Sequence, residues 1–150
     1  MEHESLLFHW DKRMLDLASH VSSWSKDPNT KVGAVITYPD NRIVSMGYNG
    51  FPRGVKDLEE RYKNRETKLK FVCHAERNAL DNAEASVAGC NMYVTLQPCC
   101  DCTKSIIQKG IKRLVTRVDT TREQYYKEFT DYSLVMLREA GVRVLQVTKE

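Results

Sequence analysis

Hydrophobic residues in the first part of the chain recur with the period of a helix. The apolar positions, three or four residues apart, are Leu7, Trp10, Met14, Leu17 and Val21. This spacing places them on one face, which predicts an amphipathic helix packed on a core. The pattern ends by Asp27-Pro28.

Two apolar, β-branched runs follow, at residues 32–38 and 42–48. Pro39-Asp40-Asn41 lies between them and is typical of a turn, so we predict an antiparallel hairpin. Residues 51–72 are instead highly charged and weakly periodic, and we interpret them as a solvated loop or a short exposed helix. The alternative is that their basic side chains contact the phosphates of a ligand. These side chains are Arg53, Lys56, Arg61, Lys63, Arg65, Lys68 and Lys70.

Helices and strands alternate along the rest of the chain. Predicted helices cover residues 75–84, 98–110 and 123–140, and predicted strands cover residues 91–96, 113–118 and 142–147. Gly110 and Gly141 stop two of the helices. Such alternation after a hairpin predicts a layered α/β domain around a mixed sheet. Because the sequence shows no internal repeat, low-complexity tract or linker, we expect residues 1–150 to form one domain.

The composition is that of a soluble globular protein, with 41% hydrophobic and 29% charged residues. The net charge of +3 could favour a phosphorylated ligand but is far from that of a dedicated nucleic-acid surface. No apolar run approaches the roughly 20 residues that span a bilayer. The start of the chain, with Glu2, His3 and Glu4, lacks the basic residues of a signal peptide. We therefore expect a cytoplasmic protein with no nucleic-acid or membrane partner.

Five cysteines are present, and three of them fall within four positions: Cys73, Cys90, Cys99, Cys100 and Cys102. An odd, clustered set without a secretory signal favours metal or catalytic chemistry over a disulfide framework. Cys99 and Cys102 are three residues apart at the first turn of a predicted helix, so their sulfurs share a face, and the helix N-terminus favours the thiolates. His74, at the start of another predicted helix, would add a neutral imidazole as a third zinc ligand.

Three protein ligands are typical of a catalytic zinc, because the fourth tetrahedral position stays open for water, whereas structural sites have four ligands. A structural zinc completed by Cys73, Cys90 or Cys100 is the alternative. Glu76, two residues after His74, leaves the helix by a different face and is therefore a poor second ligand. It is placed instead to flank the metal-activated water and to move its proton.

His74-Ala75-Glu76 and Pro98-Cys99-Cys100-Asp101-Cys102 reproduce the signature of the zinc-dependent deaminases, histidine-x-glutamate and then proline-cysteine-x-x-cysteine. Beyond it, three further stretches resemble deoxycytidylate deaminases closely. They are Ser25-Lys26-Asp27-Pro28-Asn29, Val32-Gly33-Ala34 and Gly47-Tyr48-Asn49-Gly50-Phe51-Pro52. The resemblance runs from residue 25 to residue 141.

The resemblance implies a three-layer α/β/α cytidine-deaminase fold with a central mixed five-stranded sheet. It also implies hydrolysis of dCMP to dUMP and ammonia, which would feed thymidylate synthesis. In that reaction Glu76 protonates N3 of cytosine and then carries a proton to the departing amine. Residues with implied or candidate roles in binding the substrate are Lys26 and Asn29 for the 5′-phosphate, Asn49 for the sugar or base, Ala75 for the polar edge of the base, and Tyr125 or Tyr126 over the base. For Asn49, a turn role beside Gly50 is equally open.

Members of this family are commonly homohexamers that dCTP activates and dTTP inhibits. Carried over, this implies that a regulator, with Mg²⁺ accompanying a nucleoside triphosphate, contacts Gly47, Tyr48, Gly50 and Arg53. Residues 49–72 contain neither Cys nor His, so we expect one zinc and not the second, structural zinc of some relatives.

Three alternatives remain open at this point. A tRNA or polynucleotide deaminase would use the same chemistry on a flipped base, but it predicts aromatic stacking and a broad basic groove. A non-enzymatic zinc-stabilised module is the second alternative. The third is a deaminase of dCTP, since dCMP and dCTP differ far from the zinc.

Overall fold

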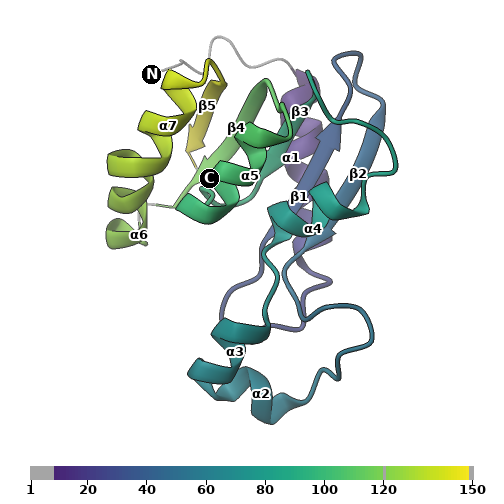
Figure 1. The fold of residues 1–150 in the computed structure, drawn as a ribbon, viewed down its shortest axis with the longest axis vertical. Coiled ribbons are helices and arrows are strands. Elements are labelled where there is room, and N and C mark those ends of the chain that lie inside the picture. Colours follow the sequence, from purple (N-terminus) through teal and green to yellow (C-terminus); the bar gives the residue numbers. More distant parts are fainter. Residues whose placement is uncertain (1–8, 120, 149–150) are drawn as a thin grey trace.

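The computed structural model describes residues 9–119 and 121–148. Five strands form one sheet in the order β2-β1-β3-β4-β5 (Figure 1). The strands are β1 (Gly33–Thr37), β2 (Ile43–Tyr48), β3 (Asn91–Val94), β4 (Arg113–Val118) and β5 (Arg143–Thr148). Strand β1 is antiparallel to both of its neighbours, while β3, β4 and β5 run parallel. The predicted hairpin and mixed five-stranded sheet are confirmed.

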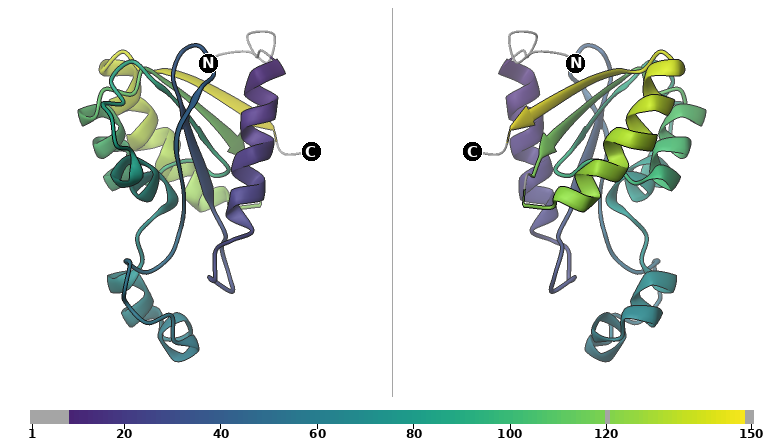
Figure 2. Two further views of the ribbon diagram at one scale, coloured as in Figure 1. Left: turned by 90° about the vertical axis from the view of Figure 1, so that its right-hand side faces the viewer. Right: turned by 90° about the vertical axis from the view of Figure 1, so that its left-hand side faces the viewer.

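Helices cover both faces of this sheet, which confirms the three-layer α/β/α architecture (Figure 2). One face is covered by α1 (His9–Ser22). The other carries α4 (Ala75–Asn82), α5 (Cys100–Gln108) and α7 (Leu134–Glu139). Since α4 and α5 begin next to His74 and Cys99, the layer on this second face holds the residues of the candidate metal centre.

Alternate strand residues supply the two hydrophobic cores, as the twofold side-chain period of a strand requires. The core under α1 contains Met14, Leu15 and Ala18 from the helix and Val35, Tyr93, Val115 and Leu145 from the sheet. The neighbouring strand residues face the other core, and they are Ala34, Ile36, Met92, Val94, Leu114 and Val144. The sheet is therefore buried on both faces, which explains its near-continuous apolar runs.

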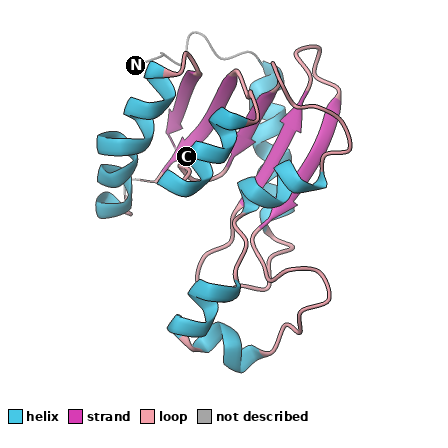
Figure 3. Cartoon of the chain, in the orientation of Figure 1, coloured by secondary structure: helices cyan, strands magenta, loops and turns pink. Residues whose placement is uncertain are grey.

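The charged segment 51–72 forms two short helices, α2 (Glu59–Lys63) and α3 (Arg65–Phe71), which project beyond the sheet (Figures 1 and 3). Tyr62 is the only buried residue of these two helices, and its ring stacks on Phe51 with ring centroids 4.1 Å apart. The segment is thus an exposed arm, as its charge pattern indicates.

The predicted helix over residues 123–140 is interrupted. It consists of α6 (Glu123–Glu128), a π-helical turn η2 (Phe129–Ser133) and α7. Phe129 and Ser133 are both buried in this turn. A π turn adds a single residue to the helical repeat, so the hydrophobic spacing of the sequence does not distinguish it from a continuous α-helix.

Gly47 brings strand β2 into contact with the backbone of helix α4. A Cβ at this position would lie 2.4 Å from the amide nitrogen of Ala79 and 2.6 Å from the carbonyl oxygen of Ala75. Gly47→Ala is therefore expected to lower the free energy of unfolding by about 3 kcal/mol, because both clashing atoms belong to a packed helix. Urea denaturation measures the change.

Gly50→Ala is the matched control. A Cβ at Gly50 meets no atom within 4 Å, so this variant is expected to stay within about 0.5 kcal/mol of the wild type. Equal losses in the two variants would contradict the steric role of Gly47.

Candidate active site

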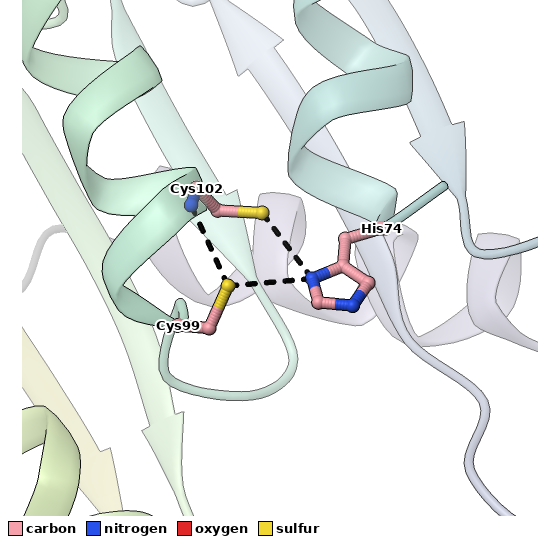
Figure 4. A group of neighbouring side chains, drawn as sticks. All are labelled: His74, Cys99 and Cys102. Carbon is pink, nitrogen blue, oxygen red and sulfur yellow. Dashed lines mark hydrogen bonds between the residues drawn. The ribbon is translucent and has the colours of Figure 1, made fainter. Parts of the chain in front are cut away.

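Three side chains that could hold a metal ion, those of His74, Cys99 and Cys102, meet where helices α4 and α5 begin (Figure 4). The Nδ1 atom of His74 lies 3.4 Å from the Sγ atom of Cys99 and 3.3 Å from that of Cys102. Cys99 is the N-cap of α5, and its sulfur accepts a hydrogen bond from the amide of Cys102, 3.4 Å away. The helix start thereby turns both sulfurs toward the imidazole.

This cluster fits a zinc ion. With Zn–S near 2.3 Å and Zn–N near 2.0 Å, a tetrahedral zinc separates a sulfur and a nitrogen ligand by about 3.6 Å. The separations of 3.3 and 3.4 Å are close to that value. Two thiols and an imidazole are also the donor types that zinc prefers. Among the described residues, the cluster has three members.

The two thiols differ in acidity because they share a proton. The pKa of Cys99 is lowered to about 4, chiefly because of the hydrogen bond from the thiol of Cys102, with a further contribution from its hydrogen bond with the ring of His74. The pKa of Cys102 is raised for the complementary reason. A divalent cation bound between them would displace the shared proton and stabilise both thiolates.

The other cysteines lie outside the cluster. The Cys100 sulfur is 3.5 Å from a carboxylate oxygen of Glu128 and 3.7 Å from the hydroxyl of Ser133. Cys90 is buried, and Cys73 forms an isolated backbone bridge with Gly50. None of the three adds a fourth ligand to the group formed by His74, Cys99 and Cys102 in the described part of the chain.

Glu76 lies in the first turn of α4 and is only 4% exposed. Burial raises its pKa to about 7, and a backbone hydrogen bond and the charge of His74 offset only part of that increase. A carboxyl group with such a pKa both accepts and donates protons near neutral pH, which suits a general acid–base group.

His74, Ala75 and Glu76 line a cavity of about 300 Å³. Val32, Leu69, Val72 and Leu96 give it apolar walls, and Thr30, Asn49 and Gln97 add polar groups. Its charged members besides Glu76 and His74 are Asp27, Arg65, Lys68 and Arg122. A cavity of this size with a few polar groups is typical of a small-molecule site.

A buried ion pair forms part of this lining. The Lys68 ammonium lies 2.9 Å from the carboxylate of Asp27, whose side chain is 3% exposed. Burial raises the pKa of Asp27, but the hydrogen bonds from Lys68 and from the amides of Asn29 and Thr30 outweigh it, so that the pKa is lowered overall. Arg122 donates to the hydroxyl of Thr30, 3.1 Å away, which brings a second cation to the cavity.

Only some of the residues expected to bind substrate line this cavity. Ala75 and Asn49 line the cavity. The Asn49 side chain accepts from the amide of Val32 at 2.8 Å and donates to the carbonyl of Thr30 at 2.8 Å, so its polar atoms hold the loop before β1.

Lys26 and Asn29 are not among the lining residues. Lys26 is exposed and pairs with Asp57 at 3.2 Å, and Asn29 donates its backbone amide to Asp27. The side chains of Tyr125 and Tyr126 lie outside the described part of the structure, although both positions belong to α6.

The residues expected to contact a regulator come together. Gly47, Tyr48, Gly50 and Arg53 all line a second cavity, of about 540 Å³. Asp57 and Asp81 also line it, and Arg53 donates to the side chain of Asn82 at 3.0 Å. Tyr48 is exposed and packs edge-on against Trp24.

Asp27, Thr30, Gln97 and Arg122 line the first cavity but were not predicted as site residues. Arg122 follows β4, and ligands of α/β sheets bind outside the carboxyl ends of the strands, so its position after that strand was an available signal. Lys68 was only one of seven basic residues in a segment expected to be exposed, and no periodicity singled it out.

Among the described residues, no helix is both long and apolar enough to cross a membrane.

Comparisons with known proteins agree with this geometry. A family model described as the cytidine and deoxycytidylate deaminase zinc-binding region matches residues 8–118. An uncharacterised deaminase from the luxG 3′ region of Aliivibrio fischeri is 42% identical over 142 residues, which cover 93% of this chain and 94% of that protein. The deoxycytidylate deaminase of Pongo abelii is 44% identical over 116 residues, which cover 73% of this chain and 65% of that enzyme.

A solved structure shares the fold. The crystal structure of a dCMP deaminase from the cyanophage S-TIM5, in complex with dCMP and dUMP, is similar with a TM-score of 0.75 and 28% sequence identity. The similarity covers 95% of this chain and 99% of the cyanophage chain.

Proposed function

Because the chain belongs to the cytidine and deoxycytidylate deaminase family, we propose that it hydrolyses dCMP to dUMP and ammonia. The observation that carries the proposal is the grouping of His74, Cys99 and Cys102 beside a buried glutamate that lines a nucleotide-sized cavity. Two relatives support the choice of substrate, the deoxycytidylate deaminase of Pongo abelii and the cyanophage enzyme with its bound dCMP and dUMP.

In this proposal His74, Cys99 and Cys102 hold one zinc ion. When bound, zinc supplies Lewis acidity that lowers the pKa of water and so allows attack on C4 near neutral pH. Glu76 accepts one proton of the attacking water and passes it to N3 of cytosine, and it later takes the second proton from the oxygen now bound to C4 and delivers it to the departing amine. One C–N bond breaks, one C–O bond forms, and water and dCMP yield dUMP and ammonia.

Arg122 and Lys68 are proposed to hold the 5′-phosphate, with Arg65 beside them. Arg122 and Lys68 are partly buried, and all three line the same cavity as Glu76. Asp27 keeps Lys68 in place through its buried ion pair. Charge-assisted hydrogen bonds from two cations that line the cavity suit a phosphate better than Lys26, which is exposed and does not line it.

Replacing Arg122 with Gln is expected to raise KM for dCMP by about 10- to 100-fold, the loss of one charge-assisted hydrogen bond, with little change in kcat. The rate on deoxycytidine, which has no phosphate, is expected to stay unchanged. Initial rates over a range of dCMP concentrations measure the effect.

Lys26→Gln is the matched control, and its KM is expected to remain within about twofold of the wild-type value because the side chain forms only a surface ion pair. A raised KM for Lys26→Gln with a normal KM for Arg122→Gln would instead assign the phosphate to Lys26.

The proposed activity is tested by ammonia release from free nucleotides. We expect dCMP to be turned over faster than cytidine, CMP or dCTP at equal concentrations, with dUMP identified by chromatography. No release from dCMP, together with turnover of dCTP, tRNA or single-stranded DNA, would overturn the proposal.

Regulation by dCTP and dTTP is a further part of the proposed function. The cavity lined by Gly47, Tyr48, Gly50 and Arg53 supports it, and the carboxylates of Asp57 and Asp81 in that cavity are suitable ligands for Mg²⁺ carried by a triphosphate. Rates on dCMP are expected to rise with dCTP and Mg²⁺ and to fall with dTTP. Rates that respond to neither nucleotide would remove regulation from the proposal.

We also propose a homohexamer on the basis of family membership. Light scattering of the purified protein measures its mass, and a monomeric mass at working concentration would contradict this assembly.

A further inference from the structure

Asn78 joins the edge strand β2 to the segment that carries His74. Its Nδ2 atom donates to the carbonyl of Tyr48 at 2.8 Å and to the carbonyl of Cys73 at 3.4 Å. Tyr48 is the last residue of β2, and Cys73 directly precedes His74. A side-chain amide has two N–H donors, so these two carbonyls use both of them.

The same residue also contacts the other side of His74. The backbone amide of Asn78 donates to the carbonyl of His74 at 3.0 Å. Gly50 and Cys73 exchange two backbone hydrogen bonds, of 3.1 and 2.7 Å, which hold the loop after β2 against the same segment. The bond to the His74 carbonyl is the ordinary helical one, so the particular contribution of the Asn78 side chain is its hydrogen bond to the carbonyl before His74.

Helix α4 has no side-chain cap at its N-terminus. His74 is the N-cap residue of α4 with extended dihedral angles, and its side chain makes no capping hydrogen bond because the ring faces the two sulfurs. The direction of the imidazole thus depends on how neighbouring residues fix this helix start. Some groups fix the orientation of a metal ligand without touching the metal. Removing such a group commonly lowers metal affinity or activity by about 10- to 100-fold.

We propose that Asn78 is a positioning residue, which sets the orientation of His74 and Glu76 by tying the carbonyl of Cys73 to the end of β2. The catalytic part of this inference rests on the proposed function, whereas its effect on zinc affinity does not. The competing explanation is that Asn78 only fastens α4 to the sheet.

Asn82 offers a matched comparison one helical turn later. Its Nδ2 atom donates to the carbonyl of Met46 at 2.9 Å, so it joins the same helix to the same strand through the same kind of hydrogen bond. Both asparagines line the same cavity. Within the described structure, the Asn82 side chain forms no hydrogen bond with Cys73 or His74, and it also accepts a hydrogen bond from Arg53. A purely fastening role predicts equal effects at the two positions.

The experiment compares Asn78→Ala with Asn82→Ala in the zinc-loaded full chain. We expect both variants to lose similar thermal stability. Only Asn78→Ala is expected to lose zinc affinity, by about tenfold in competition with a chromophoric chelator. This variant is also expected to lose about tenfold in kcat on dCMP with KM within twofold. Asn82→Ala is expected to stay within about twofold of the wild type in zinc affinity.

Asn78→Asp and Asn82→Asp form a second pair that keeps the side-chain shape but replaces the donor amide by an acceptor. The same asymmetry is expected, and this pair decides the question if an alanine variant fails to fold. Equal changes in zinc affinity at positions 78 and 82 would overturn the proposal. A wild-type protein inactive on dCMP would count against the proposed function, while the zinc comparison would still decide the role of Asn78.

Discussion

Glu76→Gln is expected to reduce the turnover of dCMP by about 10²- to 10⁴-fold, the range that a general acid–base group contributes. Glutamine has the shape of glutamate, so the buried site keeps its packing, but its amide neither accepts the proton of water nor delivers one to N3 or to the amine. Glu76 is 4% exposed, so water from the solvent has little access to this position and does not take over the proton transfer. Ammonia release at saturating dCMP measures the loss.

The control for this prediction is Glu84→Gln, which makes the same chemical change at an exposed position just after α4. Its rate is expected to equal that of the wild type. Zinc content and circular dichroism of Glu76→Gln are expected to be unchanged, because the cluster of His74, Cys99 and Cys102 does not include the glutamate. An unchanged rate in Glu76→Gln would remove this residue from the mechanism.

Cys99→Ser is expected to abolish zinc binding at working concentrations and, with it, deamination. A serine hydroxyl stays protonated near neutral pH and is a poor zinc ligand, and only His74 and Cys102 would remain of the three donors. We expect zinc affinity to fall by more than about 100-fold. That exceeds the largest loss commonly seen when a group that only orients a ligand is removed, because here the ligand itself is lost. Metal analysis after dialysis against a weak chelator measures it.

Cys100→Ser makes the same substitution at the neighbouring position. Its sulfur faces Glu128 and Ser133 and lies outside the metal cluster, so zinc content and activity are expected to remain at wild-type levels. Loss of zinc in Cys100→Ser with retention in Cys99→Ser would reverse the assignment of ligands.

The layers of the fold were predictable because each element buries one regular face. The spacing of Met14 and Val21 indicated α1, and the β-branched run before Tyr38 indicated β1. The order of the strands was not predictable from these patterns, because β1 lies between β2 and β3 through pairings that depend on the whole sheet. The π turn that buries Phe129 and Ser133 also left no trace in the periodicity.

Part of the candidate site was likewise predictable from the sequence, and part was not. The spacing of Cys99 and Cys102 at a helix start predicted that their sulfurs share a face, whereas their grouping with His74 followed from the resemblance to the zinc-deaminase signature. Arg122 and Lys68 come from a loop and from the arm, and only the three-dimensional structure brings them into one cavity. Lys26 lies in a stretch that resembles deoxycytidylate deaminases and was therefore expected to bind the phosphate. The sequence did not show that its side chain forms an ion pair with Asp57.

The sparse burial of α2 and α3 has a consequence for how a nucleotide reaches the site. Tyr62 is the only buried residue of these helices, and elements with so few buried contacts open in local fluctuations that cost far less free energy than global unfolding. Lys68, on α3, lines the cavity, so one wall of the cavity belongs to a segment that opens easily. Backbone amides of the arm should therefore exchange with deuterium well before those of the sheet, and entry and release of the nucleotide need not disturb the metal cluster.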